Sequence, residues 1–419
     1  MSTVPQVAAH PPASAPIPPT APAPAGRPPR GAAPVPSAVG AATGLLDAFR
    51  AGDRFLATPT RTLLAHGVLR EVPHGAAPVA ERVSAALAEA RDGRHAASVV
   101  LGAIPFDQDA PAALVVPGTV RTGPALASDP LVALPADAPR AAAWTVRPHP
   151  EPEHYSQGVA AAVERMWKGE FSKVVLARTL EVTGPGQPDI PAMVRRLARR
   201  DPCGYTFALP THAGRTLLGA SPELLVSRRG DRLVSNPLAG STPRSDDLAE
   251  DVRRAAALLE SAKDLHEHAV VVDAVQRAMG PYCSVIDVPA RPSLIRTAAM
   301  WHLSTTITGT LAHPEVSALE IASSLHPTPA VCGTPTPLAR DVIRETEPFD
   351  RGFFTGIVGW GDADGNGEWV VTIRCAEADD RTLRLYAGAG VVAASVPADE
   401  TAETAAKFRT FLHAVGAEL

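Results

Sequence analysis

Four ionisable residues lie three or four positions apart in one stretch of the chain: Glu260, Lys263, Asp264 and Glu267. Residues at this spacing share one face of a helix. Such a face is often an ordinary charged stripe in contact with water. It can also be an acidic platform for a metal ion, and because carboxylate oxygens are hard ligands, magnesium suits it better than zinc.

Two further residues occupy surroundings that are unusual for their type. Lys173 stands at the start of an apolar run, 174–177, and Glu223 lies within a second apolar run, 217–226. Poor solvation favours the uncharged form of either group. An uncharged lysine can act as a general base and a protonated carboxyl as a general acid. A lysine at the edge of a strand can also simply point to water.

Near the C-terminus, Glu403 and Lys407 lie four positions apart on a predicted helix. A pair at this spacing is most often a surface ion pair of little consequence. The spacing alone gives no further role to either residue.

Three shorter motifs resemble known sites but lack the required context. The segment 388–393 matches a dinucleotide-binding fingerprint, yet too little chain follows for the rest of that fold. The segment 362–367 begins like a calcium loop, but Ile373 stands where a glutamate is needed. His266 and His268 point to different sides of a helix, so they cannot easily share one zinc ion.

The elements that must position these residues are a mixture of helices and strands. Apolar patterns predict helices over 80–90, 155–168, 248–279, 317–324, 337–345 and 401–415. They predict strands over 97–104, 173–182, 205–209, 216–226, 284–288, 300–311, 356–360, 368–375 and 382–387. Hairpins interspersed with helices predict an α+β architecture, in which helices cover antiparallel sheets.

Composition narrows the class of protein. The chain has 419 residues, of which 45% are hydrophobic, so it can bury a large core. The net charge is -5 and no basic stripe stands out, which argues against nucleic acid and membranes as partners. No apolar run is long enough to span a bilayer. Four widely spaced cysteines indicate reduced thiols in the cytoplasm: Cys203, Cys283, Cys332 and Cys375.

The N-terminal segment differs from the rest of the chain. Of the 43 prolines, 12 lie in the first 40 residues, together with many alanines. This composition predicts a disordered tail over 1–42, followed by a single catalytic domain over 43–419. The tail could bind a proline-reading partner or be dispensable.

Eight segments resemble, in order, the motifs of the chorismate-utilising enzymes. They are 172–178, 219–225, 236–241, 263–268, 356–360, 369–375, 387–390 and 403–407. The resemblance runs from about residue 45 to the C-terminus. It implies the fold of that family, with large antiparallel sheets packed together and flanked by helices.

Some residues resemble one branch of this family. Members that add ammonia to chorismate do not carry the lysine found at position 173, whereas members that add water do. The segments 55–64, 325–331 and 369–374 resemble isochorismate synthases, the first and last those of catecholate siderophore pathways. The resemblance implies magnesium-dependent conversion of chorismate to isochorismate, supplying 2,3-dihydroxybenzoate.

The resemblance also implies roles for individual residues. Neutral Lys173 would deprotonate the water that attacks ring carbon two, and protonated Glu223 would donate to the hydroxyl leaving carbon four. Glu267 and Glu403 would hold Mg²⁺. The residues implied to contact the substrate are Gly240, Ser241, Ala330, Arg374, Gly388 and Lys407, with Arg374 on the enolpyruvyl carboxylate.

Several alternatives remain open on the sequence. A salicylate synthase would begin with the same water addition, and an isochorismate synthase can also supply menaquinone. A chorismate-binding regulator without activity is the non-enzyme alternative. The expected form is a monomer that needs no glutamine amidotransferase subunit.

Overall fold

The computed structural model describes residues 39–92, 99–139, 144–184 and 186–417. The predicted disordered tail lies almost wholly outside these residues. The first described helix, α1, begins at Ala41, and Ala42 and Thr43 are already buried. The predicted boundary between tail and catalytic domain stays a prediction.

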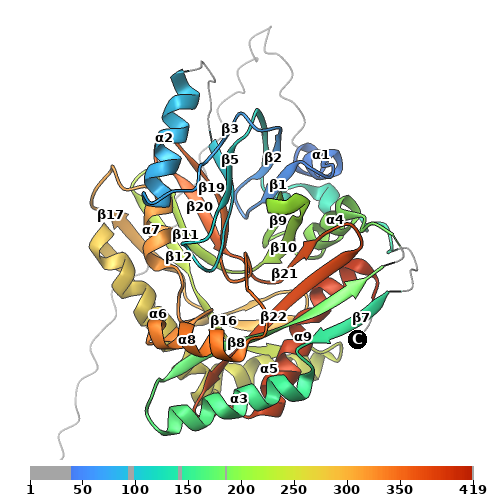
Figure 1. Cartoon of the computed structure of the whole chain (residues 1–419), viewed down its shortest axis with the longest axis vertical. Helices are drawn as coiled ribbons and strands as arrows, with labels where there is room; N and C mark the ends of the chain where they lie inside the picture. The colour runs from blue at the N-terminus through green and yellow to red at the C-terminus, as the bar shows by residue number, and fades with distance from the viewer. Residues whose placement is uncertain (1–38, 93–98, 140–143, 185, 418–419) are drawn as a thin grey trace, which may run out of the picture. The chain divides into compact units, whose positions relative to one another are not determined.

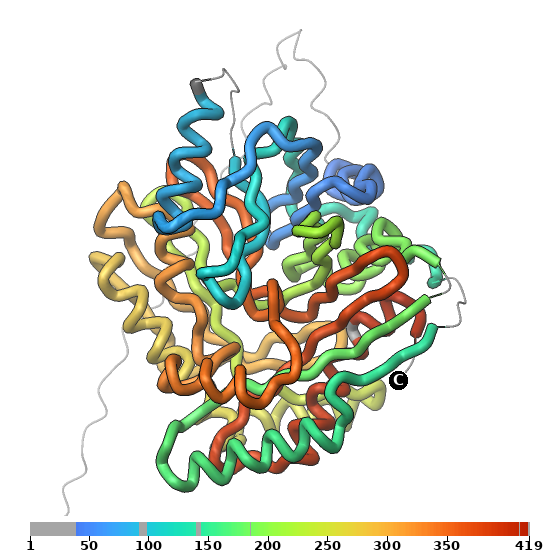
Figure 2. The backbone as a smooth tube through the Cα atoms, in the orientation of Figure 1, coloured from blue at the N-terminus to red at the C-terminus, as the bar shows by residue number. Residues whose placement is uncertain are grey.

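A ten-stranded antiparallel sheet carries the predicted base (Figure 1). Its order is β18 (Gly333–Thr334), β8 (Lys173–Thr183), β22 (Thr382–Val392), β21 (Cys375–Ala378), β10 (Thr216–Ser221), β9 (Tyr205–Pro210), β1 (Arg54–Ala57), β2 (Thr62–His66) and β6 (Thr119–Gly123), and β7 (Thr145–His149) pairs with β8. Strands β8 and β22 pair along their whole length. Figure 2 shows them side by side, in green and red, although they are far apart in the sequence.

Two further sheets complete the β-structure of the described residues. The nine-stranded sheet has the order β14 (Cys283–Asp287), β17 (Ile307–Leu311), β12 (Arg232–Asn236), β11 (Leu224–Arg229), β20 (Gly367–Val371), β19 (Ile357–Asp362), β4 (Val99–Ile104), β5 (Ala113–Val116) and β3 (Arg70–Glu71). The three-stranded sheet has the order β13 (Leu238–Pro243), β16 (Met300–Ser304) and β15 (Ser293–Arg296). Side chains of the two large sheets share one apolar core, which includes Phe207, Leu217, Val358 and Trp360.

Helices flank the sheets, as the α+β prediction requires. They are α1 (Ala41–Ala48), α2 (Val79–Asp92), α3 (Pro152–Trp167), α4 (Ile190–Arg200), α5 (Leu248–Glu260), α6 (Ala262–Met279), α7 (Ala318–Leu325), α8 (Thr336–Thr346) and α9 (Pro397–Val415). Helix α9 packs on β22 and α3, whereas α7 packs on β11 and β20. None of the described helices is long and apolar enough to cross a membrane.

Three segments that were predicted as single strands each contain two strands, so these predictions are wrong. Within each segment the chain leaves one sheet and enters another. The run 216–226 divides at Pro222, which has no N–H to continue the ladder, so β10 and β11 belong to different sheets. The run 300–311 divides into β16 and β17, and the run 368–375 divides into β20 and β21. Glu223 and Arg374 therefore lie at crossings between sheets.

The single long helix predicted over 248–279 is also wrong. The backbone is extended at Ser261, whose side chain accepts a hydrogen bond from the N–H of Asp264 and caps α6. Glu260 consequently ends α5 and does not continue the helical face that carries Glu267. The predicted strand 97–104 begins outside the described residues, and the rest of it forms β4.

Candidate functional site

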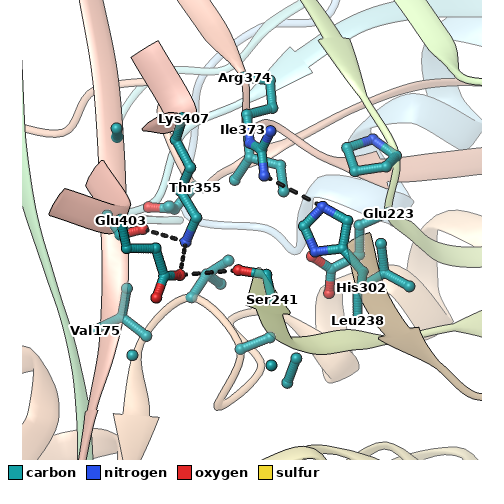
Figure 3. Close-up of a pocket in the computed structure, with 18 of the residues that line it drawn as sticks. Val175, Glu223, Leu238, Ser241, His302, Thr355, Ile373, Arg374, Glu403 and Lys407 are labelled. Atoms are coloured by element: carbon teal, nitrogen blue, oxygen red, sulfur yellow. Dashed lines mark hydrogen bonds and ion pairs between the residues drawn. The ribbon is translucent and has the colours of Figure 1, made fainter. Parts of the chain in front are cut away.

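One cavity brings together nine of the ten site residues expected from the sequence. Its volume is roughly 690 Å³, counting space open to solvent (Figure 3). The nine that line it are Glu223, Gly240, Ser241, Glu267, Ala330, Arg374, Gly388, Glu403 and Lys407. The tenth, Lys173, does not line the cavity itself, but its ammonium group contacts Glu267.

Glu223 lies at the crossing between β10 and β11. It is only 3% exposed. Burial raises the pKa of this carboxyl to about 7, and the N–H of Leu238 and the charge of Lys173 offset part of that shift. A carboxyl with this pKa holds its proton in much of the population near neutral pH. It can therefore serve as a general acid.

Arg374 lies at the second crossing, between β20 and β21. Its φ of 50° is in the left-handed region, which costs a residue with a side chain about 1 kcal/mol or more. Burial lowers the pKa of its guanidinium to about 10, while the charges of Glu403 and Asp201 oppose this shift. Arg374 thus remains a cation at neutral pH, and it lines the cavity where an anionic group would bind.

His302 is a cavity residue that the sequence analysis missed. Its Nε2 lies 3.3 Å from Nη2 of Arg374, as the dashed line in Figure 3 marks. Burial, followed by the charges of Arg374 and Lys407, lowers the pKa of His302 well below its usual value. The ring is therefore neutral, and Nε2 accepts the hydrogen bond. One signal in the sequence could have identified it: His302 is an ionisable residue in a largely apolar strand that begins at Met300.

Other lining residues were not singled out as site residues, although most of them lie within the motif segments. They are Val175, Pro222, Leu238, Ala239, Val331, Phe354, Thr355, Ile373, Tyr386, Ala387 and Gly390. Most are apolar or contribute backbone, so their residue types carry no signal of chemistry. Their position follows only from the way the sheets meet.

Lys173 begins β8, and its side chain is 1% exposed. Its Nζ lies 2.9 Å from Oε1 of Glu267 on α6. Gly390 on β22 makes room for this pair, because a Cβ there would clash with Glu267 and approach Cε of Lys173 to 3.3 Å. The glycines of the segment 388–393 thus lie within a strand and not at the turn that a dinucleotide site requires.

Glu403 and Lys407 form a second acid–base pair, on α9. Nζ of Lys407 lies 2.6 Å from Oε1 of Glu403 and 2.8 Å from the carbonyl oxygen of Gly388. Ser241 Oγ donates to the same carboxylate oxygen at 3.0 Å (Figure 3). Burial opposes ionisation of Glu403, but Lys407 and Ser241 hold its pKa below the usual value. This pair faces the cavity and is not the exposed surface pair that was the alternative.

The two carboxylates suit a magnesium ion. Glu267 and Glu403 enter the same cavity from α6 and α9. Within the described ranges, no group of three or more His, Cys, Asp or Glu side chains is arranged to hold a metal. Magnesium commonly takes one or two protein carboxylates and completes its shell with water and substrate oxygens, so two carboxylates fit it. His268 is instead hydrogen-bonded to Thr305, at 2.7 Å.

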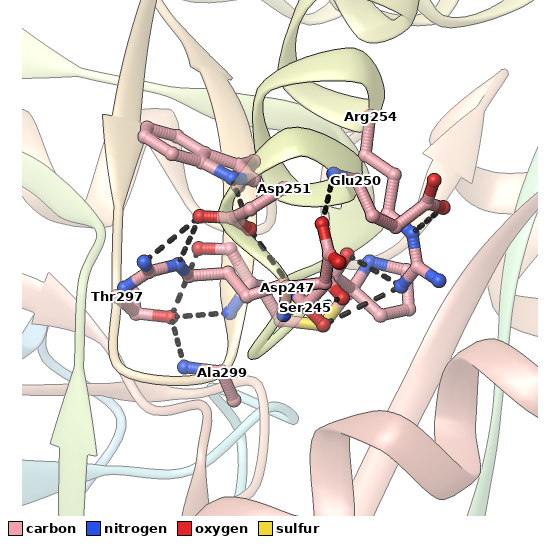
Figure 4. A network of polar contacts seen from close by, with 11 residues as sticks. Ser245, Asp247, Glu250, Asp251, Arg254, Thr297 and Ala299 are labelled. Atoms are coloured by element: carbon pink, nitrogen blue, oxygen red, sulfur yellow. Dashed lines mark hydrogen bonds and ion pairs between the residues drawn. The ribbon is translucent and has the colours of Figure 1, made fainter.

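Asp251 on α5 anchors the strands behind the cavity (Figure 4). Its carboxylate accepts hydrogen bonds from Arg244 at 2.9 Å, from Ser245 N–H at 3.0 Å and from Trp301 Nε1 at 2.9 Å. The bond from Arg244, followed by that from Ser245, lowers the pKa of Asp251 to about 2. The network therefore ties the end of β13 to β16, the strand that carries His302.

A buried cation, Arg374, and an acid with a raised pKa, Glu223, at one cavity are typical of an enzyme that acts on a small anionic compound. The model of the chorismate binding enzyme family matches residues 131–416, and the chain belongs to that family. It is 53% identical to isochorismate synthase DhbC of Bacillus subtilis over 387 residues, 89% of this chain and 96% of that protein.

Two further relatives agree with this assignment. The vibriobactin-specific isochorismate synthase of Vibrio cholerae is 45% identical over 87% of this chain and 92% of its own length. A crystal structure assigned to a 2,3-dihydroxybenzoate-specific isochorismate synthase, DhbC, of Bacillus anthracis superposes with a TM-score of 0.85. It is 48% identical and covers 90% of this chain and 100% of its own. The family and the α+β fold expected from the sequence are confirmed.

The raised pKa of Glu223 predicts a pH dependence of stability. Between the usual 4.5 and about 7, the folded protein binds this proton more tightly than the unfolded chain does. The free energy of unfolding should therefore fall as the pH rises through this window, by about 3 kcal/mol in total. Glu223→Gln removes the titration, so the variant should gain stability relative to the parent from pH 5 to pH 8. Urea unfolding at several pH values measures the difference, and parallel profiles would contradict the assignment.

Proposed function

We propose that this protein is an isochorismate synthase, an isomerase that adds water to ring carbon two of chorismate and releases the hydroxyl from carbon four. The observation that carries the proposal is the meeting of a buried acid, Glu223, with the Lys173–Glu267 pair and Arg374 at one cavity. Incubation with chorismate and Mg²⁺, followed by chromatographic identification of the product, tests it directly.

Binding of chorismate follows from the charges in the cavity. Arg374 is a buried cation with room for a bidentate contact to the enolpyruvyl carboxylate. Glu267 and Glu403 would hold Mg²⁺, which neutralises the ring carboxylate when bound. The other residues proposed to contact the substrate line the same cavity: Gly240, Ser241, Ala330, Gly388 and Lys407.

The reaction needs one group to take a proton and another to give one. Lys173 accepts a proton from the attacking water, and Glu223 donates one to the departing hydroxyl as the ring double bonds shift. Lys173 must be neutral to do this, and its Nζ lies 2.9 Å from Oε1 of Glu267, which fixes the position of the amine. General acid and general base each contribute roughly 10²- to 10⁴-fold.

The proposal extends to the pathway and to the working form of the enzyme. The similarity to DhbC and to the vibriobactin-specific enzyme supports a role in supplying 2,3-dihydroxybenzoate for a siderophore. Water is the nucleophile, so the reaction needs no ammonia and no glutamine amidotransferase subunit. We propose that the enzyme acts as a cytoplasmic monomer.

Lys173→Ala tests the proposed base. The variant should lose turnover by about 10²-fold or more, because the attacking water keeps its proton. Chorismate consumption measures the rate, and circular dichroism with a melting curve checks that the variant folds. Normal turnover in the folded variant would remove Lys173 from the mechanism.

Chelation tests the proposed metal. Excess EDTA should abolish activity and added Mg²⁺ should restore it. Glu267→Gln should raise the Mg²⁺ concentration needed for half-maximal rate by about tenfold or more, as loss of a metal-orienting group typically does. Glu260→Gln, at the exposed end of α5, is the matched control and should titrate like the parent. Full activity in EDTA would exclude magnesium.

The nature of the product separates isochorismate from salicylate. Salicylate formation adds a second step, in which a ring hydrogen passes to the enolpyruvyl group and pyruvate leaves. That step requires a different placement of the intermediate against the wall around Ala330, and a displacement of about 1 Å can cost on the order of a hundredfold. We expect isochorismate to accumulate without pyruvate. A lactate dehydrogenase-coupled assay measures this, and steady pyruvate release would identify a salicylate synthase.

A further inference from the structure

A buried arginine outside the cavity makes an unusually complete set of hydrogen bonds. Arg351 is 3% exposed. Its Nε and Nη2 donate to the two carboxylate oxygens of Glu347, at 2.8 and 2.5 Å. Nη1 donates to the carbonyl of Val331 at 2.8 Å and to Oγ1 of Thr355 at 3.2 Å, and Nη2 donates to the carbonyl of Val175 at 2.7 Å. The guanidinium therefore joins four separate positions of the chain.

The three neutral acceptors all line the cavity, and they come from three different segments. Val175 lies on β8, two residues after the proposed base Lys173. Val331 follows Ala330 in the loop that forms one wall. Thr355 precedes β19, and its φ of 58° is in the left-handed region. The segment after Val331 already contacts β8 through the main chain, because Val175 N–H donates to the carbonyl of Cys332 at 2.8 Å and β18 pairs with β8. Arg351 adds a side-chain connection from these two segments to Thr355.

Glu347 connects the same network to a fifth position of the chain, Ala177. Its Oε1 accepts a hydrogen bond from the N–H of Ala177 at 2.8 Å. The Arg351–Glu347 pair is therefore hydrogen-bonded to β8 at two alternate residues, Val175 and Ala177, which lie two and four positions after Lys173. The wall around Thr355 is held from the other side as well, because its carbonyl accepts a hydrogen bond from Nε2 of His326 at 2.8 Å.

The location of the Arg351–Glu347 ion pair indicates a role beyond stabilising the fold. A buried ion pair is an inefficient way to stabilise a fold, because removing both charges from water costs about as much as their attraction returns. Its hydrogen bonds to main-chain and hydroxyl oxygens of the cavity wall fix distances between the walls. Such fixed distances matter to catalysis, because reaction rates fall steeply when reacting groups are displaced.

We propose that Arg351, oriented by Glu347, is a positioning residue that fixes the strand carrying Lys173 relative to the cavity wall at Ala330 and Thr355. The inference rests on the proposed isomerisation of chorismate. Arg351 touches neither substrate nor metal in this scheme. Its effect on the reaction is exerted through Val175, Val331 and Thr355.

Arg351→Lys tests the proposal against a matched control. Lysine keeps the charge but not the planar fork, so it cannot bridge the same acceptors. Arg228 offers the comparison, since it is 5% exposed and donates to the carbonyls of Gly230, Pro314 and Val316, which are not cavity residues. Arg228→Lys should lower the melting temperature to a similar extent and leave turnover unchanged.

We expect kcat of Arg351→Lys to fall between about tenfold and a hundredfold, with KM for chorismate within about threefold of the parent, because Arg374 and Ser241 still bind the substrate. Equal kcat in Arg351→Lys and Arg228→Lys would overturn the proposal, as would a rise in KM at unchanged kcat. Should Arg351→Lys not fold, Glu347→Gln takes its place, and unchanged kcat would again overturn it. An inactive parent enzyme would instead contradict the proposed function, so the two failures are distinguishable.

Discussion

The site depends on keeping ionisable groups out of water while giving each a different set of partners. Lys173, Glu223 and Arg374 are each 6% exposed or less. All three lie at or beside points where strands change sheets or begin, so the meeting of the sheets buries them. Glu223 and Arg374 also line the cavity, and Lys173 is connected to it through Glu267. Burial alone would favour the neutral form of every one of these groups.

Among the buried acids, hydrogen bonds and ion pairs offset the effect of burial on the pKa to different extents. Asp129 is fully buried, yet hydrogen bonds from the Thr43 and Gly40 N–H groups outweigh that burial and lower its pKa to about 2. Glu403 is likewise held ionised by Lys407. Within the described part of the chain, no ion pair joins Glu223 to a lysine or arginine, and its pKa stays near 7. The same fold thus provides carboxylates with lowered pKa values, such as Asp129 and Glu403, and at the cavity an acid with a raised pKa, Glu223.

The sequence predicted which ionisable residues meet at the cavity better than it predicted the surfaces that hold them. Glu267 and Glu403 were recognisable because a carboxylate in a fixed motif carries a signal in its own residue type. The sequence did not predict that the strand ends at Pro222, because an apolar run has the same pattern whether the chain stays in one sheet or enters another. Thr355 and Arg351 were missed for a related reason: their partners are main-chain oxygens of distant segments, and such contacts leave no pattern along the chain.

Arg351 binds the main chain of the cavity wall, so the spacing of the walls does not depend on the side chains that contact the substrate. It binds carbonyl oxygens of Val175 and Val331, which any residue at those positions would supply. The side chains there, and that of Ala330, are free to differ without loss of the hydrogen bonds that space the walls. A chorismate-binding enzyme built in this way can keep its proposed base, acid and metal ligands at constant distances. The wall side chains then determine how the intermediate lies, and therefore whether the enolpyruvyl group is retained.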